Sequence, residues 1–144
     1  MKRFAVAGSV LVLAFAGVLL ADEKALKELE GKYAVTHMEK AGKVAEKAKS
    51  DSVKIAIMGD EMIITIEDKQ DTQERKAKLK VNAAVTPHTI DIMPSEGDAK
   101  GKTFPGIYKI AKGVVTLAFT EEGDRPTEFK AEGKVMLLKL KKTK

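Results

Sequence analysis

The 144-residue chain has no cysteine, no tryptophan and only two histidines. Without cysteine it can form no disulfide, no thiolate metal site and no thiol nucleophile, and it cannot carry the cysteine-linked lipid of a lipoprotein. A zinc site usually takes three or more protein ligands, so His37 and His88 would need a carboxylate as well, and nothing in the sequence places them together. We therefore predict no metal site and no cofactor.

An excess of charge of one sign is also lacking. Lysine and arginine number 26 and aspartate and glutamate 21, which gives a formal net charge of +5. The two signs are interspersed, as on an ordinary soluble surface. Only the C-terminal end, with lysines at 139, 141, 142 and 144, is basic throughout. It contains no aromatic residues among its lysines, which argues against nucleic-acid binding.

Recognisable catalytic motifs are missing. Catalysis needs a nucleophile, or an acid and a base, held together in a pocket. None of the four serines lies in a nucleophile-elbow pattern. Adjacent carboxylates such as Glu121 and Glu122 fall in expected turns, and the glycines occur singly rather than in a phosphate-binding loop. We predict that the protein is not an enzyme and has no catalytic residues.

The one long apolar run lies at the N-terminus. Lys2 and Arg3 precede residues 4–20, which are apolar or small apart from one serine. Ala21 ends the run, directly before a charged segment, and this order is typical of a secretory signal peptide. An uncleaved membrane anchor is the alternative, because about 18 apolar residues can just span a bilayer. We predict cleavage after Ala21 and a periplasmic or secreted protein, with a single domain over residues 22–144 and no membrane span after cleavage.

A short helix over Ala21–Glu30, ended by Gly31, is expected to open the domain. Beyond it the apolar residues alternate with polar ones, as in β-strands with one buried face. Residues 44–49 are expected to add a single helical turn. The alternation and the intervening turn residues predict eight strands, at 32–39, 53–58, 62–67, 76–83, 89–93, 103–111, 114–120 and 134–141.

Eight consecutive antiparallel strands leave two exposed edges unless the sheet closes. An up-and-down barrel of eight strands removes both edges, and every connection is short enough to join neighbouring strands. A two-sheet sandwich would also bury one face of each strand and is the alternative. The expected fold class is therefore mainly β: a small antiparallel eight-stranded β-barrel with a short N-terminal helix, behind a signal peptide.

Four segments carry a resemblance to a known family. They are "LKELEGKYAVTHMEKAGK", "TIDIMPSEGDAKGKTFPGIYKI", "VVTLAFTEEGDRPTEF" and "VMLLKLKK". In combination they resemble the uncharacterised lipocalin-like domain family abundant in Planctomycetes, over roughly Leu26–Lys141. The resemblance implies an exported, small, lipocalin-like barrel. It implies no activity, because the role of that family is not established.

The resemblance also suggests a contact at one end of the barrel. Gly31, Lys32 and Tyr33 stand where lipocalin-like barrels often have glycine, any residue and tryptophan on the first strand. A basic side chain usually stacks over that aromatic ring, and Arg125 is the candidate here. Such a cation–π contact would contribute about 0.5 to 2 kcal/mol.

Three further residues are assigned structural roles. Gly106 is expected at a β-bulge and Gly113 in a turn, where glycine tolerates unusual backbone geometry. Pro126 is expected to stiffen the loop before the last strand. No binding residue can be assigned from the sequence.

Two hypotheses for function follow. In the first, the protein binds a small apolar or amphipathic ligand in a cavity lined by residues such as Tyr33, Ile55, Phe104 and Tyr108. In the second, the barrel is filled and an exposed apolar patch binds a protein partner or serves a structural role. The crowded large side chains of 53–68 favour the filled barrel, because they can occupy the interior of eight strands. The lipocalin resemblance favours ligand binding, which we place first. Whether the barrel is hollow separates the two.

Overall fold

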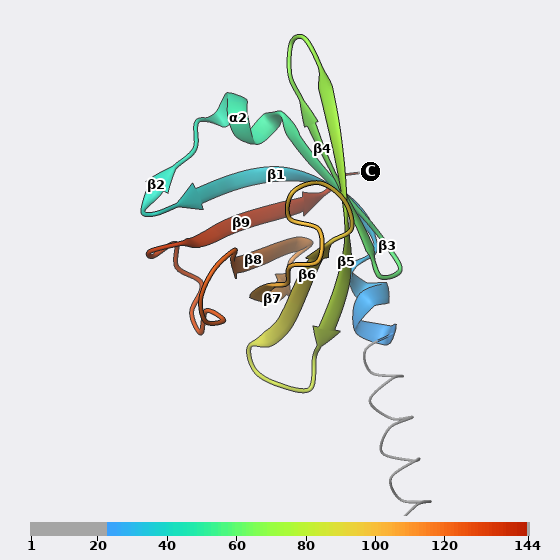
Figure 1. The fold of residues 1–144 in the computed structure, drawn as a ribbon. Helices are drawn as coiled ribbons and strands as arrows, with labels where there is room; N and C mark the ends of the chain where they lie inside the picture. The colour runs from blue at the N-terminus through green and yellow to red at the C-terminus, as the bar shows by residue number, and fades with distance from the viewer. Residues whose placement is uncertain (1–22, 144) are drawn as a thin grey trace, which may run out of the picture.

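The computed structural model describes residues 23–143 (Figure 1). The proposed signal peptide, residues 1–21, lies outside this range. Residues 23–29 form a helix. The elements that follow it are β1 (Gly31–Lys40), β2 (Lys43–Val44), α2 (Lys47–Asp51), β3 (Val53–Met58), β4 (Glu61–Glu67), β5 (Thr72–Asn82), β6 (His88–Pro94), β7 (Phe104–Ala111), β8 (Val114–Thr120) and β9 (Val135–Lys142).

The strands form a closed antiparallel barrel. From β3 to β9 each strand pairs with the next along the chain, and β1 pairs with both β3 and β9. The closing pair places Val35 opposite Leu140 and Lys40 opposite Met136. The two-residue β2 pairs only with the end of β1 and stands outside the ring. The predicted eight-stranded up-and-down barrel is therefore confirmed, and the sandwich is excluded.

Alternation along each strand builds the interior core. Ile55 and Ile57 on β3 face the inside opposite Ile64 and Met62 on β4, while the intervening residues face outward. A shift of register between Val35 and His37 on β1 turns Met38 toward the interior. Bulges of this kind bend a strand and re-aim the side chains that follow.

Two predicted elements differ from the structure. The helical turn expected at 44–49 is displaced to α2, because Lys43 and Val44 pair with β1 first. The strand expected at 76–83 begins earlier, at Thr72. Thr72 to Arg75 are all polar, so alternation could not reveal them, and it is pairing with β4 that holds them extended.

The barrel has a closed end, where β1 begins and the helix 23–29 lies (Figure 1). Leu29, at the last turn of this helix, is 1% exposed and belongs to the interior core. The Tyr33 hydroxyl donates a 2.6 Å hydrogen bond to the Leu29 carbonyl oxygen, which has no partner further along the helix. Glu30 accepts a hydrogen bond from the Gly59 backbone amide in the β3–β4 turn. The helix thus plugs this end.

A second, smaller core lies outside the barrel wall. Ile107, Ala118 and Leu137 face outward from β7, β8 and β9, and all three are buried. Residues 121–134, called the strap below, cover them with Phe129 and Ala131. The Ala131 carbonyl also accepts a hydrogen bond from the Gly42 amide beyond β1. The strap is therefore packed against the outer wall.

Candidate functional site

The interior is hollow toward the open end, opposite the helix. A cavity of about 780 Å³ reaches from the middle of the barrel to the first residues of β5 and to the loop that joins β6 to β7. This volume lies within the ordinary range of small-molecule sites. Apolar side chains from seven strands line it, among them Ile55, Met62, Ile64, Ala77, Ile92, Phe104, Leu117, Phe119 and Leu138.

The sequence-based list of lining residues is half right. Ile55 and Phe104 line the cavity, but Tyr33 and Tyr108 do not. Both tyrosines are almost completely buried. Tyr33 is engaged by the helix 23–29, and Tyr108 packs its ring against that of His88, with centroids 5.4 Å apart. Large aromatic groups therefore fill the closed half, and the hollow is displaced toward the other end.

Charged residues surround the mouth of the cavity. The residues in question are Glu74, Arg75, Lys76, Glu96, Asp98 and Glu121. Arg75 differs from its neighbours on β5, because strand alternation places it on the same face as the buried Ala77 and Leu79. It pairs with Ile64, which also lines the cavity. Arg75 is exposed, so it lies on the inward strand face at the rim of the barrel.

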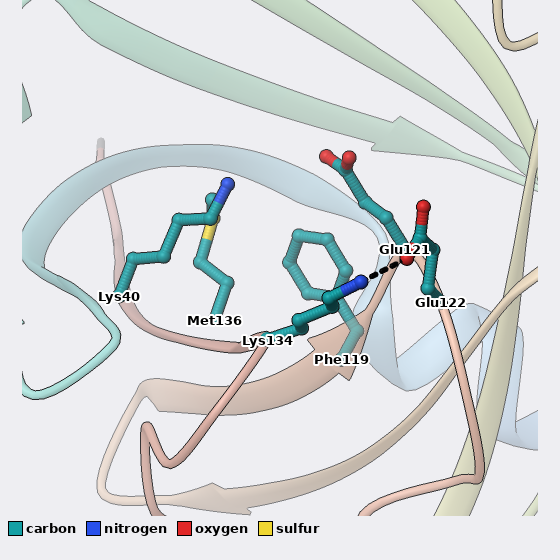
Figure 2. Close-up of a pocket in the computed structure, with 6 residues that line it drawn as sticks. All are labelled: Lys40, Phe119, Glu121, Glu122, Lys134 and Met136. Carbon is teal, nitrogen blue, oxygen red and sulfur yellow. Dashed lines mark hydrogen bonds and ion pairs between the residues drawn. The ribbon is translucent and has the colours of Figure 1, made fainter.

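A smaller hollow of about 310 Å³ adjoins the cavity and shares Phe119 and Glu121 with it. Figure 2 shows the Phe119 ring at its centre, with Lys40 and Met136 on one side and the two glutamates on the other. Lys134 forms an ion pair with Glu122. This hydrogen bond and the lysine charge hold the pKa of the Glu122 carboxyl below its ordinary value. Lys40 reaches this position because the β1 bulge reverses the facing of the residues after it.

Arg125 lies elsewhere than expected. Its Nη1 donates to the carbonyl oxygens of Ile90, at 3.1 Å, and Gly106, at 2.9 Å. Its Nη2 lies 2.7 Å from Asp91 Oδ1 on the outer face of β6. The predicted stacking of Arg125 on Tyr33 is therefore wrong. The cation near that ring is Lys142, whose Nζ is 6.0 Å from the centroid.

Glycine is required for different reasons at the three predicted structural positions. Gly31 has φ +146°, a conformation that L-residues rarely adopt, at the junction of helix and strand. The predicted bulge at Gly106 is wrong, because its pairing with Ile90 and Phe119 is regular. A Cβ there would lie 2.7 Å from the Ala118 carbonyl oxygen, so it is close approach of β7 and β8 that requires glycine. Gly113 lies in the β7–β8 turn with φ +76°.

Pro126 lies in the strap, next to Arg125.

The two histidines lie on opposite sides of the barrel. His37 is on β1 and His88 begins β6, and these strands are four strands apart in either direction around the ring. Within residues 23–143 no group of three histidine, aspartate or glutamate side chains is placed to hold a metal ion. The same residues contain no helix that is both long and apolar enough to cross a membrane.

Sequence reasoning missed Arg75. Its inward position follows from spacing, since residues 75, 77, 79 and 81 share one strand face. The prediction failed because the polar residues at the start of β5 are typical of a loop. Lys40 could not have been found in this way, since its inward position depends on the bulge.

Comparisons of the chain with protein-family models, with curated proteins and with solved structures each find no match. The resemblance to a lipocalin-like family therefore stays a prediction.

Proposed function

We propose that the protein is an exported, lipocalin-like binding module that holds a small apolar or amphipathic molecule in the open half of its barrel. The observation that carries the proposal is the cavity of about 780 Å³, with an apolar floor and a charged mouth. Sites for small molecules are concave and mostly apolar, with few polar groups that orient the ligand. Export rests on residues 1–21, which have the layout of a signal peptide.

The half-buried side chains of the cavity support this assignment. Ile64, Phe104 and Phe119 face the interior yet remain partly exposed, unlike the core residues near the helix. A ligand that covered them would remove apolar surface from water, and each buried methylene group would contribute about 0.8 kcal/mol. Apolar side chains in the closed half are already buried by folding. Those in the open half remain partly exposed, and a ligand could bury them.

The second candidate is an interaction or structural domain without a ligand. Four large hydrophobic side chains are exposed on the described surface: Val44, Met58, Val85 and Ile110. They belong to different strands or loops, and Met58 is the most exposed at 70%. Single exposed hydrophobic residues are common on soluble proteins, so we rank this function second.

The test is binding of the neutral fluorescent probe N-phenyl-1-naphthylamine to the purified protein. We expect Ile64→Trp, which places an indole in the cavity, to weaken probe binding by roughly tenfold or more. Ile63→Trp is the matched control, because Ile63 is the next residue on β4 and faces outward. Equal binding by both variants, or no binding by the wild type, would reject the cavity as a ligand site.

Native mass spectrometry of protein recovered from its own host complements the probe. A reproducible extra mass that is lost on denaturation would identify the class of the ligand by its fragmentation. A bare chain, together with no probe binding, would favour the filled-barrel alternative.

A further inference from the structure

The inward-facing charge at the mouth narrows the class of ligand. Arg75 lies two residues from Ala77, which is buried, and directly opposite Ile64 on the neighbouring strand. Residues two apart on a strand are separated by about 6.5 Å, so the exposed Arg75 side chain begins one step above the apolar floor. A molecule whose apolar part occupied the floor would bring its head group to this level.

Arg75 has no counter-charge of its own. It forms no ion pair with any residue between 23 and 143, and its one hydrogen bond there is to Gln73 Oε1 at 3.5 Å. Arg125, by comparison, is bound to an aspartate and to two carbonyl oxygens. The planar Arg75 guanidinium therefore keeps most of its five donors available, in a geometry that matches carboxylate and phosphate oxygens.

We propose that the ligand is a single-chain amphiphile with an anionic head group, a carboxylate or a phosphate monoester, bound by Arg75 at the mouth of the cavity. This inference rests on the proposed function. Four carboxylates also line the cavity, at Glu74, Glu96, Asp98 and Glu121. Glu74 belongs to the outward face of β5, Glu96 and Asp98 to the loop after β6, and Glu121 follows the end of β8. None of them shares the inward strand face next to the floor, which is why we assign the head group to Arg75.

The experiment measures displacement of N-phenyl-1-naphthylamine by four dodecyl compounds of equal chain length: the alcohol, the carboxylate, the phosphate and the amine, at pH 7 and low salt. We expect the better of the two anions to bind roughly tenfold or more tightly than the alcohol, because hydrogen bonds to charged groups contribute more than neutral ones. The carboxylate and phosphate arms distinguish the two sources of the anionic group.

Variants then locate the effect. Arg75→Gln should abolish the preference for the anion over the alcohol, and Arg75→Lys should retain part of the preference. Lys78→Gln is the matched control, because it removes the same charge from the outward face of β5 and is exposed. Its preference for the anion should equal that of the wild type.

The outcomes separate the two proposals. If the probe and all four compounds fail to bind, the proposed function is rejected and the inference with it. If the alcohol binds but the anions show no advantage, only the inference is overturned. Tighter binding of the amine would overturn it as well and would assign the head group to the carboxylates. An equal loss in Arg75→Gln and Lys78→Gln would show that only the overall charge matters.

Discussion

The two ends of the barrel are built from similar residues and have different interiors. At the closed end Ile57 and Leu140 are at most 2% exposed, in the same core cluster as Leu29 of the helix. At the open end the inward-facing Ile64 and Phe119 remain half-buried. Strand alternation alone therefore does not complete the core of this barrel. The core is completed where a further element covers the end, and a cavity remains where none does.

The strap shows what else the open end depends on. Glu121, its first residue, lines the cavity, and the rest of the strap packs against the outside of β7, β8 and β9. It nevertheless supplies Glu122 and Lys134, which lie beside Phe119 in the smaller hollow (Figure 2). The shape of the mouth thus depends on a segment that is held against the outer wall of the barrel by Arg125 and Phe129.

The largest effect is expected at the plug. Leu29→Ala should lower the free energy of unfolding by about 2 to 5 kcal/mol, because it empties a fully buried position. Ile64→Ala at the open end should cost clearly less, since its side chain already borders a hollow. Urea denaturation of both variants measures the difference. Equal losses would break the distinction between a filled and a hollow end.

An intermediate effect is expected at the anchor of the strap. Arg125→Ala removes three hydrogen bonds, two to strand carbonyls and one to Asp91, and the ion pair with Asp91. Loss of charged hydrogen bonds of this kind costs about 1 to 3 kcal/mol. Hydrogen exchange should show faster opening of the strap, with unchanged protection of β1 and β3 beside the plug.

The matched control for this variant is Lys130→Ala in the same strap. It breaks only the exposed pair with Glu128, and exposed pairs contribute little. A loss of stability as large as that of Arg125→Ala would mean that the strap is held by its general charge instead of by the Arg125 anchor. Faster exchange at the closed end would mean that the two ends are coupled.

The features of the fold and site that the sequence predicts are those set by interactions between residues close together along the chain. The eight strands and their order follow from alternation and turns, which act between near neighbours along the chain. Arg125 was misplaced because its partners lie 19 to 35 residues earlier and are mostly backbone carbonyls, which no side-chain pattern reveals. The tyrosines were assigned to the cavity because the position of the plug, and hence which half is filled, depends on how the helix 23–29 folds back.

The smallest effect is expected at Tyr33, and it carries a pH signature. Tyr33→Phe keeps the ring in the core but leaves the Leu29 carbonyl without its donor, which should cost about 1 kcal/mol at neutral pH. Burial raises the pKa of the Tyr33 hydroxyl above its ordinary value of 10.0. The neutral form is thus favoured by folding, so this contribution is complete below pH 10.0 and is lost as the pH rises through the raised pKa.

Wild type and Tyr33→Phe should therefore converge in stability in alkaline urea titrations, with the difference shrinking above about pH 10. Tyr108→Phe is the comparison, because it changes the other buried tyrosine without touching the Leu29 carbonyl. A difference between wild type and Tyr33→Phe that stayed constant to high pH would mean that the hydroxyl ionises as easily folded as unfolded. Water would then reach the Tyr33 hydroxyl beneath the helix 23–29. The closed end would be more accessible to solvent, and so more like the open end, than its burial indicates.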